Sequence, residues 1–250
     1  MAKRIQAIAT VMTFGMLSSA AQAGLVTIDY DFTKTVSNPP FFETSPSLTL
    51  TAISVTPSEI TADQAPQITA TASVPDTTIS TGFTTTVITT TNDYVAQGSA
   101  GLGVYWTGSQ TTSTPLGRLT TPLIDTSPEI DGFGPDDTLN FAFSNFNFVS
   151  HVAVTLAGVT LIQANDDVRI LLNGSLAGTY DPTNGPEPQN ISLNIALKAG
   201  DVLSFAVAGE NDDFGVASLR LVATVPEPGT LALLGAGLAG IGYKRRKKAA

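Results

Sequence analysis

The chain has 250 residues, of which 12 are lysine or arginine, 21 are aspartate or glutamate and none is cysteine, and its net charge at pH 7 is −9. Without cysteine it cannot form a disulfide, use a thiol nucleophile, or build a zinc–thiolate or iron–sulfur centre. Its acidic balance also argues against nucleic acid as a partner, because phosphate recognition needs clustered cations.

The N-terminal segment has the layout of a secretory signal peptide. Two cations, Lys3 and Arg4, precede an apolar stretch that ends at Leu17, and Ala21 and Ala23 form a small-residue A-x-A cleavage site. We expect signal peptidase to remove the first 23 residues. The alternative is an uncleaved anchor, which the short apolar stretch makes less favourable.

Residues 24–224 form the predicted passenger domain. They contain five cations and 20 acidic residues, so their net charge is −15. Runs rich in Thr, Val and Ile, with prolines between them, predict short β-strands in the first half. These runs are Leu25–Phe32, Ser47–Val55, Gln67–Val74 and Phe83–Thr90.

The threonine-rich stretch from Thr77 to Thr91 has two interpretations. It is typical of a low-complexity or glycosylated stalk, or it is a half-exposed pair of strands. The strand pair is favoured because Phe83, Val87 and Ile88 would anchor it in the core.

The second half has clearer β patterning. Leu139, Phe141 and Phe143 share one face of a strand, and the apolar phase then shifts, which predicts a bulge or turn near residues 144–145. Asn173-Gly174 predicts a two-residue hairpin. Further alternation predicts strands at Ile191–Leu197 and Val202–Ala208, separated by a turn at Ala199-Gly200-Asp201, and a last strand at Val216–Ala223. The sequence therefore predicts one all-β, antiparallel β-sandwich over residues 24–224.

Several residues are candidates for chemistry, each with a plainer alternative. His151 is the only histidine, and without a nucleophile-elbow motif it is better explained as an ordinary strand residue. Trp106, beside Tyr105 and near Phe133, could stack on a sugar ring, although a core position is favoured.

The acidic residues offer two kinds of site. Carboxylates suit Ca²⁺, and the best candidates are Asp166, Asp167, Asp212 and Asp213, which belong to two Asn-Asp-Asp runs. Paired acids could also hydrolyse a glycoside. Solvated loop charges are the simpler interpretation, and no metal or other cofactor is required by the sequence.

The C-terminal segment, residues 225–250, has the order of a membrane stop signal. Pro226-Glu227-Pro228 is followed by an uncharged stretch from Gly229 to Tyr243 and then by five cations, Lys244–Lys248. As a helix the segment from Pro228 to Tyr243 would be about 24 Å long, which makes it a short transmembrane helix in a hydrocarbon layer of about 30 Å. The cations are expected to stay on the cytoplasmic side.

This tail resembles the PEP-CTERM protein-sorting tail, in which an exosortase of Gram-negative bacteria recognises the Pro-Glu-Pro sequence. The resemblance implies export, transient anchoring in the inner membrane, and delivery to the cell surface or medium, with Pro226, Glu227 and Pro228 as the sorting determinant. Residues 98–224 are also similar to passenger domains that often carry such tails, through loose motifs such as Gly101–Val104 and Asn211–Phe214. That similarity implies a jelly-roll-like surface domain without known catalysis.

The resulting functional expectation is a non-enzymatic surface or extracellular-matrix protein in an exopolysaccharide or biofilm context. A calcium-assisted carbohydrate-binding module is the first alternative, and a secreted hydrolase with paired carboxylates is the second.

Overall fold

The computed structural model describes residues 24–34, 42–56, 65–99, 101–125, 129–131, 136–146, 154–162, 167–181, 188–207 and 213–225. These residues form 17 β-strands and contain no helix. Residues 25–225 make up one compact unit. The predicted signal peptide and all but the first residue of the predicted tail lie outside the described residues.

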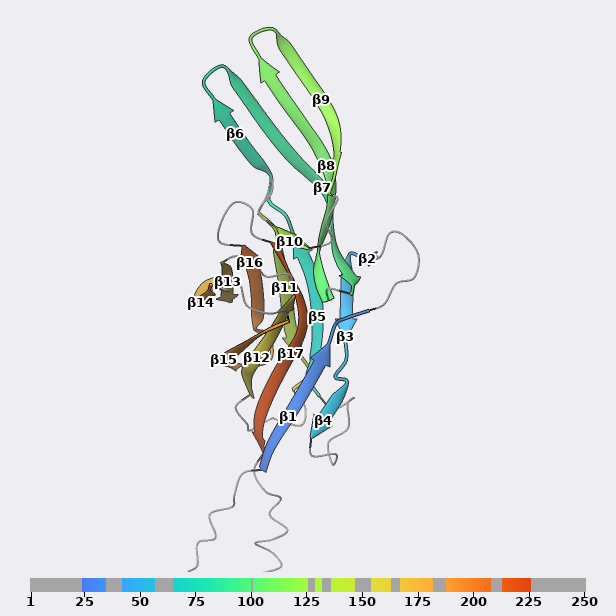
Figure 1. Cartoon of the computed structure of the whole chain (residues 1–250), viewed down its shortest axis with the longest axis vertical. Coiled ribbons are helices and arrows are strands. Elements are labelled where there is room, and N and C mark those ends of the chain that lie inside the picture. Colours follow the sequence, from blue (N-terminus) through green and yellow to red (C-terminus); the bar gives the residue numbers. More distant parts are fainter. Residues whose placement is uncertain are drawn as a thin grey trace, which may run out of the picture. The chain divides into compact units, whose positions relative to one another are not determined.

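The strands form two antiparallel sheets (Figure 1). The order of the first sheet is β15 (Gln189–Leu197), β12 (Val154–Ile162), β17 (Asp213–Val225), β8 (Gly101–Thr114), β7 (Thr84–Gly98) and β2 (Phe42–Ser45), with β1 (Gly24–Asp31), β4 (Ser54–Thr56), β6 (Thr77–Thr81), β9 (Gly117–Ile124) and β10 (Ile130–Asp131) paired to its members. The order of the second sheet is β14 (Ser175–Tyr180), β13 (Val168–Leu172), β16 (Val202–Val207), β11 (Thr138–Ser144), β5 (Gln67–Ser73) and β3 (Ser47–Leu50).

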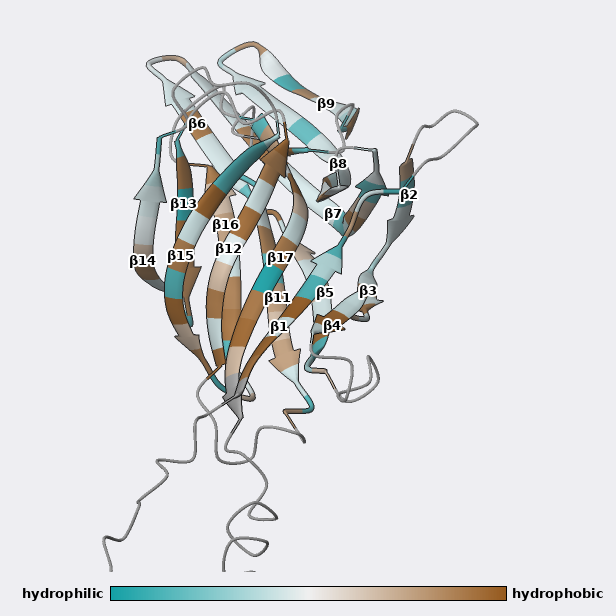
Figure 2. Ribbon diagram, turned by 60° about the horizontal axis from the view of Figure 1, so that its bottom comes forward, coloured by the Kyte–Doolittle hydropathy of each residue, from teal (hydrophilic) through white to brown (hydrophobic). Residues whose placement is uncertain are grey.

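The core lies between the two sheets. Phe32, just after β1 in the first sheet, stacks on Phe141 of β11 in the second, with ring centroids 5.6 Å apart. Phe141 also meets Phe205 of β16 edge to face, at 5.7 Å. All three side chains are fully buried, and strands of both sheets show brown, apolar bands in Figure 2. These contacts confirm the predicted all-β sandwich.

Local predictions in the second half are confirmed residue by residue. Leu139, Phe141 and Phe143 are all buried, and Asn145 has a φ of 60°, so the chain turns where the apolar phase shifts. The hairpin between β13 and β14 turns at Asn173 and Gly174, with φ values of 52° and 77°. Both residues therefore have the left-handed conformation that a type I′ turn requires.

The predicted strand Ser47–Val55 is wrong in one respect. It is two strands in different sheets, because β3 pairs with β5 in the second sheet and β4 pairs with β1 in the first. The chain changes sheets at residues 51–53, where Ala52 is buried and Ile53 is 64% exposed. The backbone N–H of Ile53 donates to the carbonyl of Asp29 at 2.9 Å, which fixes the crossing.

The threonine-rich stretch is a strand pair, as favoured from the sequence, but its surroundings differ from the prediction. Strands β6 and β7 form a hairpin through residues 77–88, and a second hairpin, β8–β9, lies beside it. The predicted anchor Phe83 is 86% exposed at the first hairpin's turn. We call residues 77–90 and 107–124 the arm, which comprises β6, β9, the turns of the two hairpins and the adjoining parts of β7 and β8. In Figure 1 it runs beyond the ends of the other strands.

Candidate functional site

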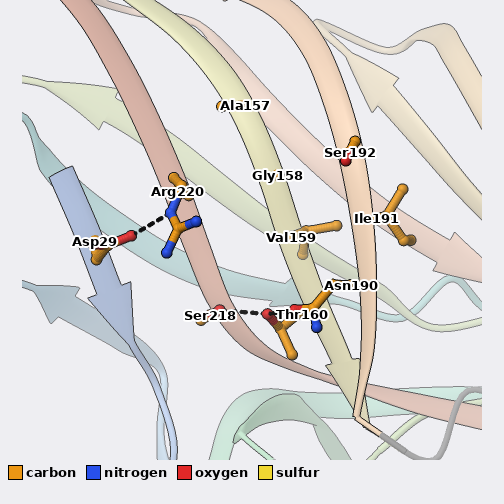
Figure 3. Close-up of a pocket in the computed structure, with 10 residues that line it drawn as sticks. All are labelled: Asp29, Ala157, Gly158, Val159, Thr160, Asn190, Ile191, Ser192, Ser218 and Arg220. Atoms are coloured by element: carbon orange, nitrogen blue, oxygen red, sulfur yellow. Dashed lines mark hydrogen bonds and ion pairs between the residues drawn. The ribbon is translucent and has the colours of Figure 1, made fainter. Parts of the chain in front are cut away.

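A shallow hollow on the outer face of the first sheet is one candidate site. It has a volume of about 170 Å³ and lies over β12, between β15 and β17 (Figure 3). A β-bulge forms it, because the register of β12 with both neighbours shifts between Leu156 and Gly158. Gly158 pairs with Arg220 of β17, and an added Cβ there would lie only 3.0 Å from the carbonyl oxygen of Ile191 on β15. We call this site the outer hollow.

Polar side chains line the outer hollow along one row of three strands. The Ser218 hydroxyl donates to Thr160 at 2.8 Å, and the Thr160 hydroxyl donates to Oδ1 of Asn190 at 2.7 Å. Backbone register places these three residues directly opposite one another. The row therefore fixes the direction of each hydroxyl and leaves the Asn190 amide as a donor at its end.

An ion pair forms the other side of the outer hollow. Nε of Arg220 donates to Oδ1 of Asp29 at 2.7 Å, and the Ser54 hydroxyl donates to Oδ2 of the same carboxylate at 3.2 Å. The Arg220 side chain is 62% exposed, against 29% for Asp29. A guanidinium held at Nε keeps its two terminal nitrogens directed outward, so it can donate to hydroxyl or anionic groups of a ligand.

Several acidic residues that flank the loops lie at one end of the sandwich, which we call the acidic end. Asp167 precedes Val168, which pairs with Val207 at the end of β16. Asp137 precedes Thr138, which pairs with the neighbouring Ala206. Asp213 begins β17 and pairs with Asp131 of β10. Strand register thus places Asp137, Asp167 and Asp213 at the same end of the sandwich.

Only two of the four predicted calcium ligands belong to the described residues. Asp167 and Asp213 leave the same end of the sandwich, whereas Asp166 and Asp212 lie outside the described residues. Among the residues that the structure describes, no group of three or more His, Asp or Glu side chains is placed to hold a metal ion. The observed geometry therefore adds no ligand set to the sequence pattern, and the calcium site stays a prediction.

The aromatic and histidine candidates have different outcomes. Trp106 is 6% exposed and belongs to the core, which agrees with the favoured interpretation and removes the sugar-stacking one. Tyr105 packs against Phe42 and Tyr94 instead. His151 and Phe133 lie outside the described residues.

Sequence reasoning missed a buried polar contact between two turns. Asp201, 4% exposed, accepts hydrogen bonds from the backbone N–H of Lys198 and from Nδ2 of Asn173, both at 2.9 Å. Oδ1 of Asn173 accepts from the N–H of Val202, also at 2.9 Å. The Asn-Gly hairpin and the Ala-Gly-Asp turn were both predicted, but no local signal shows that they bind each other.

The C-terminal site begins on a strand that is held from several sides. β17 pairs with β12, β8, β10 and β1, and its pairing with β12 runs from Ile162↔Gly215 to Val154↔Ala223. It ends at Val225, directly before Pro226. Proline has no backbone N–H for the ladder, so it is a natural point for the chain to leave the sheet.

Residues 224–247 match the PEP-CTERM protein-sorting motif. The match includes the Pro226-Glu227-Pro228 sequence and starts on the last two residues of β17. The PEP-CTERM motif implies export, processing by an exosortase-type enzyme, and a surface or extracellular location. It confirms the resemblance that the sequence suggested.

Two further findings bear on the site. The search of curated proteins gives no significant match to the chain. In the ranges for which structure is described, there is no helix with the length and hydropathy to cross a membrane. The predicted transmembrane helix and the residues Pro226, Glu227 and Pro228, like Ala21 and Ala23 of the predicted signal cleavage site, are outside those ranges.

Proposed function

We propose that this protein is a non-catalytic surface or extracellular-matrix protein, sorted through its PEP-CTERM tail and active in an exopolysaccharide or biofilm context. One observation carries the proposal: the sorting motif begins where the central strand β17 ends. The tail is therefore joined to a finished sheet. Cleavage in or after the Pro-Glu-Pro sequence would release a sandwich that keeps all of its strands.

The anchoring of β17 supports this order of events. Strand β17 contributes the buried side chains Leu219, Leu221 and Ala223 close to its C-terminal end. These residues are paired to β12, so the C-terminal part of β17 is itself a member of the core sheet. A passenger with such a boundary can exist both attached to a membrane and free, which is what sorting requires.

Intact-mass measurement of the full-length protein expressed in its natural host tests the proposal. The surface fraction should lack residues 1–23 and the basic residues Lys244–Lys248. A Pro226→Ala/Pro228→Ala variant should keep the basic tail and stay with the membrane fraction, whereas Pro122→Ala, which changes a proline of β9, should be processed normally. Surface protein that still carries Lys244–Lys248 would contradict exosortase processing.

The outer hollow favours a second function, carbohydrate binding. A row of oriented hydroxyls, an amide and a partly exposed guanidinium are groups that bind sugar hydroxyls. The volume of about 170 Å³ is below the roughly 300 Å³ of typical small-molecule sites, so it fits a single sugar unit of a polymer. The calcium-assisted form of this function also needs the acidic loops, of which Asp166 and Asp212 lie outside the described residues.

Binding to the host's own exopolysaccharide distinguishes these possibilities. Retention of the full chain on immobilised polysaccharide should fall in Arg220→Gln and stay unchanged in Arg118→Gln, which alters an exposed cation of the arm. Equal retention of both variants would remove the outer hollow from consideration. Release of new reducing ends from the polysaccharide would instead favour the hydrolase with paired carboxylates and contradict the non-catalytic proposal.

A further inference from the structure

Among the described residues, most of the large exposed apolar side chains belong to the arm. Eight large hydrophobic residues are exposed among the described residues, and five of them belong to the arm. Two occupy the hairpin turns, where Phe83 is 86% and Leu116 is 99% exposed. The other three are Ile79 (49%), Leu119 (67%) and Ile124 (62%).

One face of the arm continues the core-facing side of the first sheet. Residues two apart on a strand share a face, so Leu102, Val104 and Trp106 of β8, all buried, lie on the same face as Gln110 and Thr112 of the arm. Ile88 pairs with Gln110 on this face and belongs to the core, and Leu123 of β9 packs against the core. We call this surface the core-side face of the arm.

Beyond Ile88 the core-side face has apolar side chains at both edges. Strand register places Ile79, Thr86, Thr112 and Leu119 in one row across β6, β7, β8 and β9. Ile79 and Leu119 stand at the two ends of the row, and the threonine hydroxyls between them are 3.4 Å apart. A sheet normally buries such a face against a second layer.

Charge favours a second copy of this chain as that layer. The passenger has a net charge of −15, yet residues 77–91 and 107–124 contain a single charged residue, Arg118. Arg118 pairs with Ser113, in a row adjacent to that of Leu119, and therefore lies on the opposite face of the arm. Two copies repel each other over the acidic sandwich but not over this neutral face. An anionic lipid surface would instead call for several cations on the face that meets it.

The area of the face indicates a weak association. Four strands about 4.8 Å apart, with about seven residues each at about 3.4 Å per residue, give roughly 450 Å² of sheet per copy. Two copies would bury roughly 900 Å², below the 1,200 Å² of a standard stable interface. Contact of this size becomes significant when copies are concentrated on one surface, because tethering raises the effective concentration.

We propose that the core-side face of the arm packs against the same face of a second copy, so that two arms form a two-layer sandwich. The interface is isologous, with Ile79 and Leu119 of each copy at the contact and Phe83 and Leu116 at its distal end. This role is independent of the function proposed for the outer hollow, and it rests on the surface location that concentrates the copies.

Single-cysteine crosslinking of the full chain on cells tests the proposal directly, since the chain has no cysteine of its own. Leu119→Cys and Ile79→Cys, on the core-side face, should give a dimer with a short bis-maleimide. Thr120→Cys is the matched control, because it is the next residue of β9 and lies on the opposite face. Leu176→Cys, at a sandwich position that is 62% exposed, is the control for random collision.

Three outcomes would overturn the proposal. The first is the same amount of dimer from all four variants, the second is no dimer from either core-side cysteine, and the third is co-sedimentation of the purified full chain with phosphatidylcholine vesicles that Leu119→Lys abolishes. The proposal also predicts that Ile79→Lys/Leu119→Lys, made in the Phe83→Cys background, loses the dimer formed by Phe83→Cys alone. An unchanged melting temperature of the triple variant would show that the sandwich is intact and that the loss belongs to the interface.

Discussion

Strands β7 and β8 run through both the sandwich and the arm, but their side chains are buried to different extents in the two regions. β8 runs through both: Leu102, Val104 and Trp106 in its first part are buried, whereas Gln110 and Thr112 in its second part are half-buried. Backbone pairing with β7 continues along the whole length, from Gly98↔Gly101 to Thr85↔Ser113. Backbone hydrogen bonds between strands are therefore present in both regions. The two regions differ in whether a second sheet covers these strands.

The comparison indicates which contacts contribute most to the free energy of unfolding. Burial of apolar side chains supplies most of it in the sandwich. In the arm, paired hydroxyls such as Thr111 and Thr120, 3.0 Å apart and exposed, contribute little. Sheets with few buried apolar contacts open locally at lower cost than core strands, so the arm should be the less stable region of an isolated molecule.

The largest contrast is expected from two phenylalanine truncations. Phe141→Ala removes a ring that stacks on Phe32 and meets Phe205 edge to face, and it should lower the free energy of unfolding by about 3–5 kcal/mol. Phe83→Ala, at the exposed tip of the arm, should change it by less than about 0.5 kcal/mol in dilute solution. Urea unfolding of both variants measures the contrast, and equal losses would break it.

The next contrast is between substitutions of Gly101 in the sandwich and Gly82 in the arm. Gly101 has a φ of 95°, and an added Cβ would lie 2.3 Å from the carbonyl oxygen of Val216. Gly101→Ala should therefore incur about 1–3 kcal/mol of backbone strain and a further 1–3 kcal/mol, approximately, from overpacking. Gly82, with a φ of 55° in the arm's first turn, has nothing within 4 Å of an added Cβ.

Gly82→Ala should therefore lower stability only through the strain of placing a Cβ on a left-handed backbone, by about 1–2 kcal/mol. That loss should be confined to the arm. The melting temperature of the sandwich, followed by near-ultraviolet circular dichroism of Trp106, should fall clearly in Gly101→Ala and hardly in Gly82→Ala. The reverse order would show that the arm and sandwich unfold as one unit.

A smaller effect is expected from the buried contact between turns. Asp201→Ala leaves the Lys198 N–H and the Asn173 amide without their acceptor, which should cost about 1–3 kcal/mol. Thr120→Ala, the corresponding removal of an exposed hydrogen bond in the arm, should change stability by less than about 0.5 kcal/mol. Chemical unfolding measures both. A loss in Thr120→Ala that matched that in Asp201→Ala would contradict the contrast.

The core was predictable because its signal is local and periodic. The alternation of Leu139, Phe141 and Phe143 marks a half-buried strand wherever it occurs, and Asn173-Gly174 specifies a turn without reference to any neighbour. The same reasoning failed where contacts between distant parts of the chain determine the structure. The alternation in Ser47–Val55 shifts phase between Ala52 and Ile53, but this local shift does not show that β3 and β4 belong to different sheets.

The arm was only half predictable for a related reason. Residues 107–124 contain few apolar side chains and no regular alternation, so β9 and the outer part of β8 carried no signal. Phe83 was predicted to be an apolar anchor of this strand pair, yet it occupies an exposed turn. The outer hollow was missed because a bulge at residues 157–158 creates it, and a glycine within a strand only hints at a bulge.

The stability of the sandwich should also depend on pH, because it buries a tyrosine hydroxyl. Tyr30 is buried, with its hydroxyl donating to the carbonyl of Pro66, and burial raises the pKa of Tyr30 well above its ordinary value. The native state therefore favours the neutral hydroxyl. Its contribution is complete below the unfolded pKa of about 10 and is lost as the pH rises above that value.

Tyr30→Phe should lower the free energy of unfolding by about 1 kcal/mol at pH 7 and should flatten its decline above about pH 10. Urea unfolding between pH 7 and pH 11 measures both changes. An unchanged alkaline slope in Tyr30→Phe would mean that this hydroxyl does not control the alkaline loss.

The smallest effect is expected from calcium at the acidic end. Millimolar Ca²⁺ should leave the melting temperature nearly unchanged relative to chelator, because the described acids form no metal-holding group. If Ca²⁺ bound there, a concentration 100 times its dissociation constant would add about 2.7 kcal/mol of stability. A rise of several degrees that is lost in Asp166→Asn or Asp212→Asn would contradict the expectation and support the calcium-assisted module.

Hydrogen exchange of the full chain at two protein concentrations tests the central contrast most directly. At low concentration the amides of β11 and β16 should be strongly protected, while those of β6 and β9 exchange much faster. At high concentration protection of β6 and β9 should rise and that of β11 and β16 should stay the same. Equal protection of arm and sandwich at both concentrations would contradict the account, since the arm would then need no second layer.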